Sequence, residues 1–321
     1  MLSEDQAVLR QAHRWCREGQ TAWLCTIVTV TGSSPRPRGA MLALNVAGDV
    51  VGSLSGGCVE EDLLQALLQG EIEINAPRLL EYGVNAEENA RLGLPCGGRL
   101  GVLVQKLDRA DTDWLDAALL AIDARYCLLR KLDLDSGETQ VTRVDSYTEP
   151  ALDERTLRQC FGPQMRMLLV GAGQLAQTLA ELAQAMDYQV IVTDPRAETL
   201  QRWRGPDIEL VQGMPDDVVL ARADDPFAIV ITLTHDPRID DMALMVALET
   251  RAWYVGALGS QRTTEKRLQR LRALEVSEVA IARLHAPVGL AIGSKTPLEI
   301  AVAIMAEITS LRRGARGATA G

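Results

Sequence analysis

Two cysteines in the first half of the chain have surroundings that suit chemistry. Cys58 follows a Gly-Gly pair, and Cys96 precedes another. Glycine has no side chain, so the backbone there can come close to whatever the thiol meets. A thiolate is both a nucleophile and a soft metal ligand. The two positions are therefore candidates for sulfur chemistry or metal contact, although two buried structural cysteines would give the same pattern.

A predicted helix begins directly after Cys58. Apolar residues recur at helical spacing over residues 59–69. The positive end of a helix dipole favours a thiolate, but the acidic side chains of Glu60, Glu61 and Asp62 in the first turn oppose it. The sequence alone leaves the net direction undecided.

Two arginines are the only charged residues of a proline-containing loop at residues 33–39. The prolines prevent regular structure there. The planar guanidinium groups of Arg36 and Arg38 can each bind a phosphate through two parallel hydrogen bonds. We therefore expect this loop to hold an anion.

The second half carries a glycine-rich segment between a predicted strand and a predicted helix. Its residues, Gly171-Ala-Gly173-Gln-Leu-Ala176, match the pattern G-x-G-x-x-A. In that context Gly171 permits a tight turn, Gly173 lets backbone N–H groups approach a phosphate, and Ala176 allows close helix packing. Asp194 ends the next predicted strand, where an acidic side chain normally accepts hydrogen bonds from ribose hydroxyls. The alternative is a Rossmann fold with an empty crevice.

His235 follows the fourth predicted strand of this half. Ligands of such sheets bind beyond the carboxyl ends of the strands, so His235 is a candidate for ligand contact. A histidine that caps the next helix or bonds a backbone carbonyl is the alternative.

The elements that must position these residues differ between the two halves. The first half mixes helices with short strands bounded by turn residues, which favours an α+β domain. We expect helices at residues 5–18, 59–69 and 113–125, and strands at residues 23–31, 40–45, 50–54, 78–82, 99–106, 126–134 and 139–144.

After residue 165 strands alternate with helices, which is typical of a parallel doubly wound sheet. Strands are expected at residues 167–170, 189–193, 209–211, 227–233, 253–256 and 284–286. The predicted fold is thus α/β, with an N-terminal α+β domain followed by a C-terminal Rossmann-like domain. We place these domains at residues 1–145 and 165–311, a linker at 146–164 and a disordered tail at 312–321.

The composition of the 321 residues excludes several classes of protein. Lys and Arg total 33 against 43 Asp and Glu, so the net charge of −10 argues against nucleic acid and anionic membranes as partners. No apolar run is long enough for a membrane helix or a signal peptide, so we expect a cytoplasmic protein. The six cysteines form no C-x-x-C pair, which argues against a disulfide framework or a zinc knuckle.

Five segments in combination resemble the XdhC-type family, and the match extends over nearly the whole chain. That family comprises accessory factors for xanthine dehydrogenase, aldehyde oxidoreductases and carbon monoxide dehydrogenase. The segments are Gly32-Ser-Ser-Pro-Arg-Pro-Arg-Gly39, Ser55-Gly-Gly-Cys-Val-Glu60, Pro95-Cys-Gly-Gly98, Gly171-Ala-Gly173 and Gly289-Leu-Ala-Ile-Gly293-Ser-Lys-Thr-Pro297.

The resemblance implies a chaperone rather than a turnover enzyme. Such a protein binds the molybdenum cofactor, as molybdopterin or its cytosine dinucleotide, and holds it while a terminal oxo ligand is exchanged for sulfur. It then inserts the cofactor into an apo molybdenum hydroxylase such as xanthine dehydrogenase or aldehyde oxidoreductase. The implied partners are that client enzyme and a cysteine desulfurase as sulfur donor. The oligomeric state stays open, a homodimer included.

The resemblance also implies site residues. Cys58, Glu60 and Cys96 are the expected reactive group, with Cys58 contacting the molybdenum of the bound cofactor. Of the cofactor-binding residues, the resemblance implies Gly171, Gly173 and Asp194. Together with the expectations from the residues themselves, the full set is Arg36, Arg38, Gly57, Gly97, Gly171, Gly173, Asp194 and His235.

The sequence departs from the family pattern at Gln174, where a histidine is common. This weakens any interpretation in which a histidine at that position performs chemistry. Two other functions remain open. One is an NAD(P)-dependent oxidoreductase, supported by the glycine loop and Asp194 alone, and the other is a sulfurtransferase with a persulfide on Cys58.

Overall fold

The computed structural model describes residues 3–32, 36–84 and 98–317. The chain divides into two units, Met1–Pro163 and Gln164–Gly321, and each is described by itself. The first unit combines helices with antiparallel sheets and the second alternates parallel strands with helices, so the predicted fold class, an α+β domain followed by a Rossmann-like domain, is confirmed.

The first unit contains an antiparallel sheet in the strand order β3-β2-β1-β5-β4. Side chains of the central strand β1 alternate between two apolar cores, because successive residues of a strand point to opposite faces. Leu24 packs with α1 and α4, whereas Cys25 and Ile27 pack with α2. The strands are β1 (Ala22–Thr31), β2 (Met41–Asn45), β3 (Val50–Gly52), β4 (Arg78–Tyr82) and β5 (Arg99–Leu107), and the helices are α1 (Glu4–Arg17), α2 (Cys58–Leu68) and α4 (Thr112–Asp123).

A second antiparallel sheet in this unit has the order β7-β6-β9-β8. Its strands are β6 (Cys127–Asp133), β7 (Thr139–Val144), β8 (Ala151–Leu152) and β9 (Thr156–Phe161).

The linker predicted at residues 146–164 is therefore wrong. Strand β9 lies within that segment and pairs with β6 along its length, from Leu128 opposite Phe161 to Asp133 opposite Thr156. Leu157 and Phe161 are buried and stabilise the pairing. The helix and strand breakers that suggested a linker lie just before β8 or after β9, not inside the strands.

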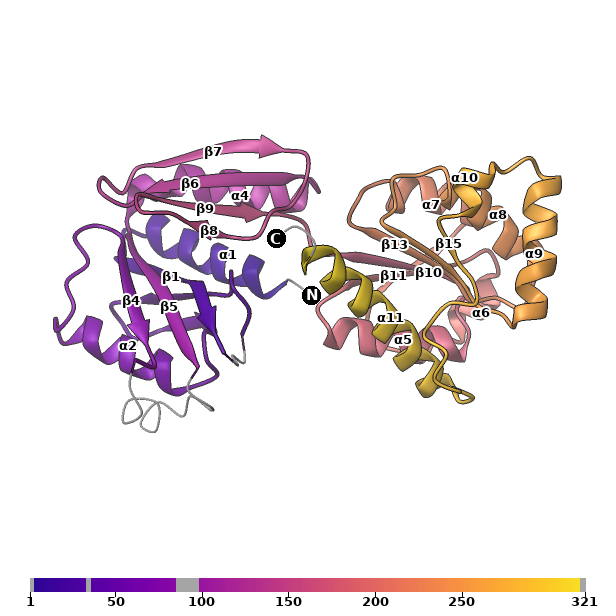
Figure 1. Ribbon diagram of the computed structural model, residues 1–321, viewed down its shortest axis with the longest axis horizontal. Helices are drawn as coiled ribbons and strands as arrows, with labels where there is room; N and C mark the ends of the chain where they lie inside the picture. The colour runs from indigo at the N-terminus through magenta and orange to yellow at the C-terminus, as the bar shows by residue number, and fades with distance from the viewer. Residues whose placement is uncertain (1–2, 33–35, 85–97, 318–321) are drawn as a thin grey trace. The chain divides into compact units, whose positions relative to one another are not determined.

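The second unit is a six-stranded parallel sheet in the order β12-β11-β10-β13-β14-β15 (Figure 1). The chain runs from β10 outward to β12, then returns to β13 on the other side of β10. At such a reversal of strand order, ligands of open α/β sheets bind in a crevice outside the carboxyl ends of the strands. The crevice is therefore expected at the ends of β10 and its neighbours. The strands are β10 (Arg166–Val170), β11 (Gln189–Asp194), β12 (Glu209–Gln212), β13 (Ala228–Thr232), β14 (Tyr254–Ala257) and β15 (Leu284–His285).

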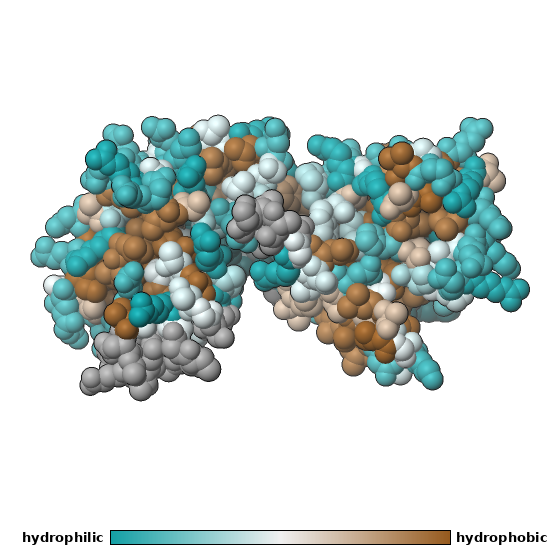
Figure 2. Space-filling view, viewed as in Figure 1, coloured by the Kyte–Doolittle hydropathy of each residue, from teal (hydrophilic) through white to brown (hydrophobic). Residues whose placement is uncertain are grey.

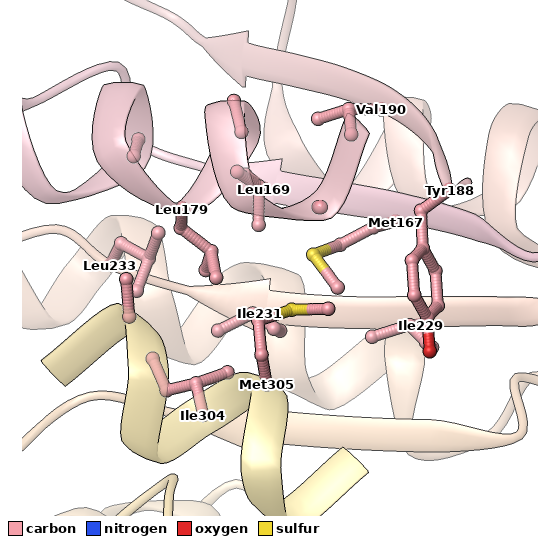
Figure 3. Packing of buried hydrophobic residues seen from close by; sticks show 14 of the residues in the cluster. Met167, Leu169, Leu179, Tyr188, Val190, Ile229, Ile231, Leu233, Ile304 and Met305 are labelled. Carbon is pink, nitrogen blue, oxygen red and sulfur yellow. The ribbon is translucent and has the colours of Figure 1, made fainter. Parts of the chain in front are cut away.

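Helices cover both faces of this sheet. Helices α5 (Gln174–Ala185) and α11 (Pro297–Gly317) pack on one face, where Leu179, Ile304 and Met305 meet the strands (Figure 3). Helices α7 (Pro215–Ala223), α8 (Pro237–Ala247) and α9 (Gln261–Ala273) pack on the other face. The short helices α6 (Ala197–Gln201) and α10 (Glu278–Ile281) complete the unit.

Helix α11 continues to Gly317, so the disordered tail predicted from residue 312 is wrong for residues 312–317. The remaining residues, 318–321, lie outside the described part of the chain. Hydrophobic side chains gather on the surface over α5 and α11 (Figure 2), where Leu298 and Val302 are exposed. Among the described residues, no helix is long and apolar enough to cross a membrane.

Candidate functional site

Cys58 is the first residue of α2, and its side chain is exposed. The other described cysteines, Cys16, Cys25, Cys127 and Cys160, are buried. Gly57 directly before Cys58 is also exposed. The structure thus presents one accessible thiol within the described residues, at the position that the sequence singled out.

Glu60 holds the loop that leads to this thiol. Its Oε1 accepts hydrogen bonds from the Ser53 hydroxyl at 2.8 Å and from three backbone N–H groups, those of Leu54 at 2.7 Å, Ser55 at 2.8 Å and Gly56 at 3.0 Å. Its Oε2 accepts from the Gly57 N–H at 3.0 Å and from the Ser55 hydroxyl. The carboxylate therefore accepts six hydrogen bonds from residues 53–57.

These bonds also set the ionisation of Glu60. Partial burial alone would raise its pKa, but the hydrogen bonds from Ser55, Gly56 and Leu54 outweigh burial and hold the pKa well below its usual range. A carboxylate bound in this way stays ionised and accepts no further proton near neutral pH. The geometry shows that Glu60 positions the loop before Cys58, and the reactive role expected from the resemblance stays a prediction.

We expect Glu60→Gln to lower the free energy of unfolding by about 1–3 kcal/mol at pH 7, because an amide NH₂ would face the Gly57 N–H or the Ser55 hydroxyl. The pKa of Glu60 is lower in the folded chain than its unfolded value of 4.5. Its contribution is thus complete above that value and is lost as the pH falls toward the folded pKa. The difference between wild type and variant in urea denaturation should therefore shrink below about pH 4.

The matched control is Glu61→Gln, which changes an exposed carboxylate on the same turn of α2. This variant should unfold like the wild type at every pH. If Glu60→Gln showed the same stability and pH profile as the wild type, the carboxylate would not be holding the loop.

The two arginines predicted to bind an anion have partners within the protein. Arg36 forms an ion pair with Glu4 at the start of α1. Arg38 donates to the backbone carbonyl of Val28 at 3.0 Å and to that of Pro150 at 2.7 Å. A phosphate at Arg38 would have to replace or share these bonds. Cys96 and Gly97 lie outside the described residues.

The sequence analysis missed a pair of neighbouring thiols. Cys127 on β6 and Cys160 on β9 are buried in adjacent strands, where Cys160 lies opposite Leu129, two residues along the strand from Cys127. A hydrogen bond from Cys127 lowers the pKa of Cys160 to about 7, and the same contact together with burial raises the pKa of Cys127. Cys160 had been assigned to the linker, so nothing in the one-dimensional pattern brought it near Cys127.

The described residues 3–32, 36–84 and 98–317 contain no group of three or more His, Cys, Asp or Glu side chains that could hold a metal ion. Cys58 alone cannot form a resident metal site. Its contact with molybdenum could only be a contact with a metal that arrives in a bound cofactor.

The glycine loop of the second unit has the geometry that its pattern predicts. Gly171 has a φ of +107°, and a Cβ there would lie 2.7 Å from Cγ2 of Thr234, so only glycine fits. Gly173 is the N-cap residue before α5, with a φ of −79°, and a Cβ there would meet no other atom within 4 Å. The space over the start of α5 is therefore open, as a phosphate site requires.

Asp194 lies at the end of β11 as predicted, and it is fully buried. Its Oδ2 accepts from the Ala172 N–H at 3.2 Å, which joins β11 to the glycine loop. Both carboxylate oxygens also accept from the side chain of Arg196, at 2.8 Å each. Burial alone would raise the pKa of Asp194, but the bonds from Arg196 and Ala172 lower it. Arg196 is a residue that the sequence analysis missed.

His235 follows β13 and is exposed, with no hydrogen bond to another described residue. The loop beside it is held by the neighbouring Thr234, whose hydroxyl donates to Asp240 at 2.7 Å. Asp240 is paired with Arg267 at 2.9 Å, and both side chains are buried. Arg267 also donates to the Leu258 carbonyl at 3.1 Å, in the loop after β14. One buried ion pair thus joins the two loops that follow β13 and β14.

Comparison with known proteins agrees with this architecture. Residues 167–308 match the model of the XdhC Rossmann domain, and residues 15–83 match the model of the XdhC and CoxI family. The chain is 27% identical to the molybdenum cofactor insertion chaperone PaoD of Escherichia coli, over 97% of this chain and 90% of that protein. It is 26% identical to a probable xanthine dehydrogenase subunit of Bacillus subtilis, over 92% of this chain and 94% of that protein.

A crystal structure of a xanthine dehydrogenase from Bacillus halodurans is also similar. It superimposes with a TM-score of 0.74 and 26% identity, over 98% of this chain and 96% of that chain. The fold is thus that of a two-unit α/β protein with a C-terminal Rossmann-type domain. The chain belongs to the XdhC family, as its motifs indicated.

Proposed function

We propose that this protein is an accessory chaperone that binds the molybdenum cofactor and inserts it into an apo molybdenum hydroxylase. The observation that carries the proposal is the exposed Cys58 at the start of α2, at the end of a loop that Glu60 holds. A relative that is similar over nearly the whole chain is named for the same task, cofactor insertion.

The thiol suits this cargo chemically. Molybdenum and its sulfur ligands are soft, and a thiolate is the soft ligand that proteins offer. In the proposed cycle Cys58 contacts the metal or the incoming sulfur while an oxo ligand is exchanged for sulfur that a cysteine desulfurase supplies as a persulfide. The oxo ligand would leave as water, and two molecules of a thiol reductant would supply the two electrons that reduce the persulfide sulfur to sulfide. Cys96 is proposed to assist, on the resemblance alone. The client is a hydroxylase of the xanthine dehydrogenase or aldehyde oxidoreductase type.

The crevice of the second unit is proposed to bind the phosphate-containing end of the cofactor, with or without a cytosine nucleotide. Its support is the open space at Gly173, directly before α5. Backbone N–H groups at a helix start favour an anion. The exposed imidazole of His235 lies in the loop after β13 and is proposed to contact the same ligand. Arg36, Arg38, Gly57 and Gly97 remain proposed contacts in the first unit.

Equilibrium binding separates this function from that of an NAD(P)-dependent oxidoreductase. The purified protein should bind molybdopterin-type cofactor more tightly than NADH and should transfer no hydride to small carbonyl substrates. Tight NADH binding with hydride transfer, and no pterin binding, would overturn the proposal.

We expect Gly173→Val to weaken cofactor binding by about tenfold or more, because the valine side chain would stand in the space that a phosphate needs. The fold should survive, since the backbone of Gly173 is extended and an added Cβ has no neighbour within 4 Å. Fluorescence titration of the pterin measures the affinity, and thermal unfolding checks the fold.

A matched control for this variant is Gly314→Val on α11, where an added Cβ also meets nothing within 4 Å. It should bind the cofactor like the wild type. Unchanged affinity in a folded Gly173→Val variant would mean that the crevice does not take part in binding.

A further inference from the structure

The tripeptide Asp-Pro-Arg occurs twice in the second unit, each time at the crevice. Residues 194–196 begin at the last residue of strand β11, and residues 236–238 follow strand β13. Both strands are hydrogen-bonded neighbours of β10, the strand that leads into the glycine loop. The two tripeptides therefore flank that loop on both sides.

The two segments adopt the same local structure. In the first, Asp194 accepts from the Arg196 backbone N–H at 3.0 Å and from its guanidinium at 2.8 Å on each carboxylate oxygen. In the second, Asp236 accepts from the Arg238 backbone N–H at 3.0 Å, from its Nε at 3.0 Å and from a terminal nitrogen at 2.8 Å. Each arginine thus folds back on its own aspartate in a bidentate pair.

This geometry removes Asp194 from ribose recognition. A carboxylate offers about four lone-pair directions. At Asp194 four N–H groups occupy them, one from Ala172 and three from Arg196. The carboxylate is also fully buried. No acceptor is left for the two hydroxyls of a ribose, which is the role that an acidic residue at this position usually has.

The guanidinium group is the more exposed partner of each pair. The Arg196 side chain is 49% exposed and that of Arg238 is 89% exposed, whereas the Asp194 side chain is 0% exposed. The pKa of Arg196 is raised chiefly by its hydrogen bond to Asp194, and Asp236 adds to this, so the two pairs lie within electrostatic reach of each other. A ligand at this edge of the sheet therefore meets more guanidinium than carboxylate surface.

Two buried hydroxyls next to these pairs lack a partner among the described residues. Thr193 and Thr232 are both opposite Val170 in the sheet, one on each side, and both are fully buried. Neither Oγ1 has a hydrogen-bond partner within residues 3–32, 36–84 and 98–317. Buried polar groups are nearly always satisfied in folded proteins, so these two hydroxyls mark an unusual polar environment in the strands that flank β10.

We infer that Arg196, together with Arg238, forms a subsite for a phosphomonoester and selects ligands that carry a phosphate where related crevices bind a ribose diol. This inference rests on the proposed use of the crevice as a phosphate site. Arg196 is the residue assigned to determine specificity. It occupies the hydrogen-bond acceptors of the Asp194 carboxylate and also presents a positive charge to the ligand.

The matched probes are NAD⁺ and NADP⁺, which differ only in one 2′-phosphate. Calorimetric titration of the full chain should show about tenfold or more tighter binding of NADP⁺. Arg196→Ala should reverse this preference: it removes the charge that binds the phosphate and frees the Asp194 carboxylate for the ribose hydroxyls of NAD⁺. Arg204→Ala, which removes an exposed arginine bonded to backbone carbonyls of the same unit, should keep the wild-type preference.

Equal affinities for the two dinucleotides, no binding of either, or an Arg196→Ala variant that still prefers NADP⁺ would each overturn the inference. Failure of the chaperone proposal would look different, because it would appear as absence of pterin binding whatever the ratio between the dinucleotides. Loss of both dinucleotides in Gly173→Val would support their binding in the crevice.

Discussion

Cys58→Ser is expected to fold like the wild type and to leave the client hydroxylase inactive. The Cys58 side chain is exposed at a helix start, so its replacement creates no cavity and buries no hydroxyl. A serine hydroxyl is not ionised near neutral pH and is a hard ligand, so it cannot replace a thiolate toward molybdenum or sulfur. Activation of apo-hydroxylase by the purified, cofactor-loaded chaperone should fall to the background level.

The control for this experiment is Cys127→Ser. Cys127 is 1% exposed in strand β6 and is bonded to the Cys160 thiol, so a serine there buries a hydroxyl and disturbs that pair. We expect a loss of about 1–3 kcal/mol in the free energy of unfolding, with activation of the client retained in the folded fraction. If Cys58→Ser activated the client at the normal rate, Cys58 would be structural and the case would depend on Cys96.

The second large effect is expected at the buried ion pair of the second unit. Arg267→Met should lower the free energy of unfolding by about 3–5 kcal/mol, because it leaves the buried Asp240 carboxylate without its partner. Burial already raises the pKa of Asp240 despite the nearby Arg267 and Thr234, so the unpaired carboxylate would be costly. The loops after β13 and β14 would also lose their shared anchor, and cofactor affinity should fall with stability.

Urea denaturation measures the loss of stability in Arg267→Met, with Arg272→Met as its control. Arg272 forms a comparable ion pair with Glu278, but on the surface of α9. Exposed pairs contribute little to stability, so the control should unfold at nearly the wild-type urea concentration. Equal unfolding midpoints for Arg267→Met and wild type would contradict the assigned role of the buried pair.

Local sequence patterns predicted most of the fold because the spacing of apolar residues reflects which face of a helix or strand is buried. The parallel sheet of the second unit follows from apolar runs alternating with helical periodicity, and its strands agree with the expected ones to within one residue at each end. The glycine loop could be placed because Gly171 needs a positive φ and Gly173 needs open space, and both needs are visible in residue type.

The strands within residues 146–164, which were predicted to be a linker, could not be found in the same way. Strand β9 is stabilised by pairing with β6, about thirty residues earlier in the chain, and such pairing leaves no periodic signal in a segment of six residues. The flanking Pro150, Gly162 and Pro163 gave a stronger local signal, which was misleading. The same error hid the neighbouring thiols of Cys127 and Cys160.

Residue type and position predicted which residues belong to the candidate site, and the hydrogen bonds of the folded chain corrected the roles of some of them. Cys58 and Asp194 were found from their positions relative to a helix start and a strand end. Two roles depend on where hydrogen-bond donors point after folding. Glu60 holds the loop before Cys58, and Arg196 fills the acceptors of the Asp194 carboxylate. Arg196 had one available signal, the repetition of Asp-Pro-Arg after two strands, which local element prediction does not weigh.

The most direct test of the account is to identify what the protein carries. The protein is purified without oxygen from cells that make molybdenum cofactor, and its bound molecules are analysed by mass spectrometry and metal analysis. The account predicts a molybdopterin-type pterin with molybdenum in a ratio near one per chain in the wild type, and much less in Gly173→Val. A wild-type protein that holds nicotinamide dinucleotide and no pterin or molybdenum would contradict the account.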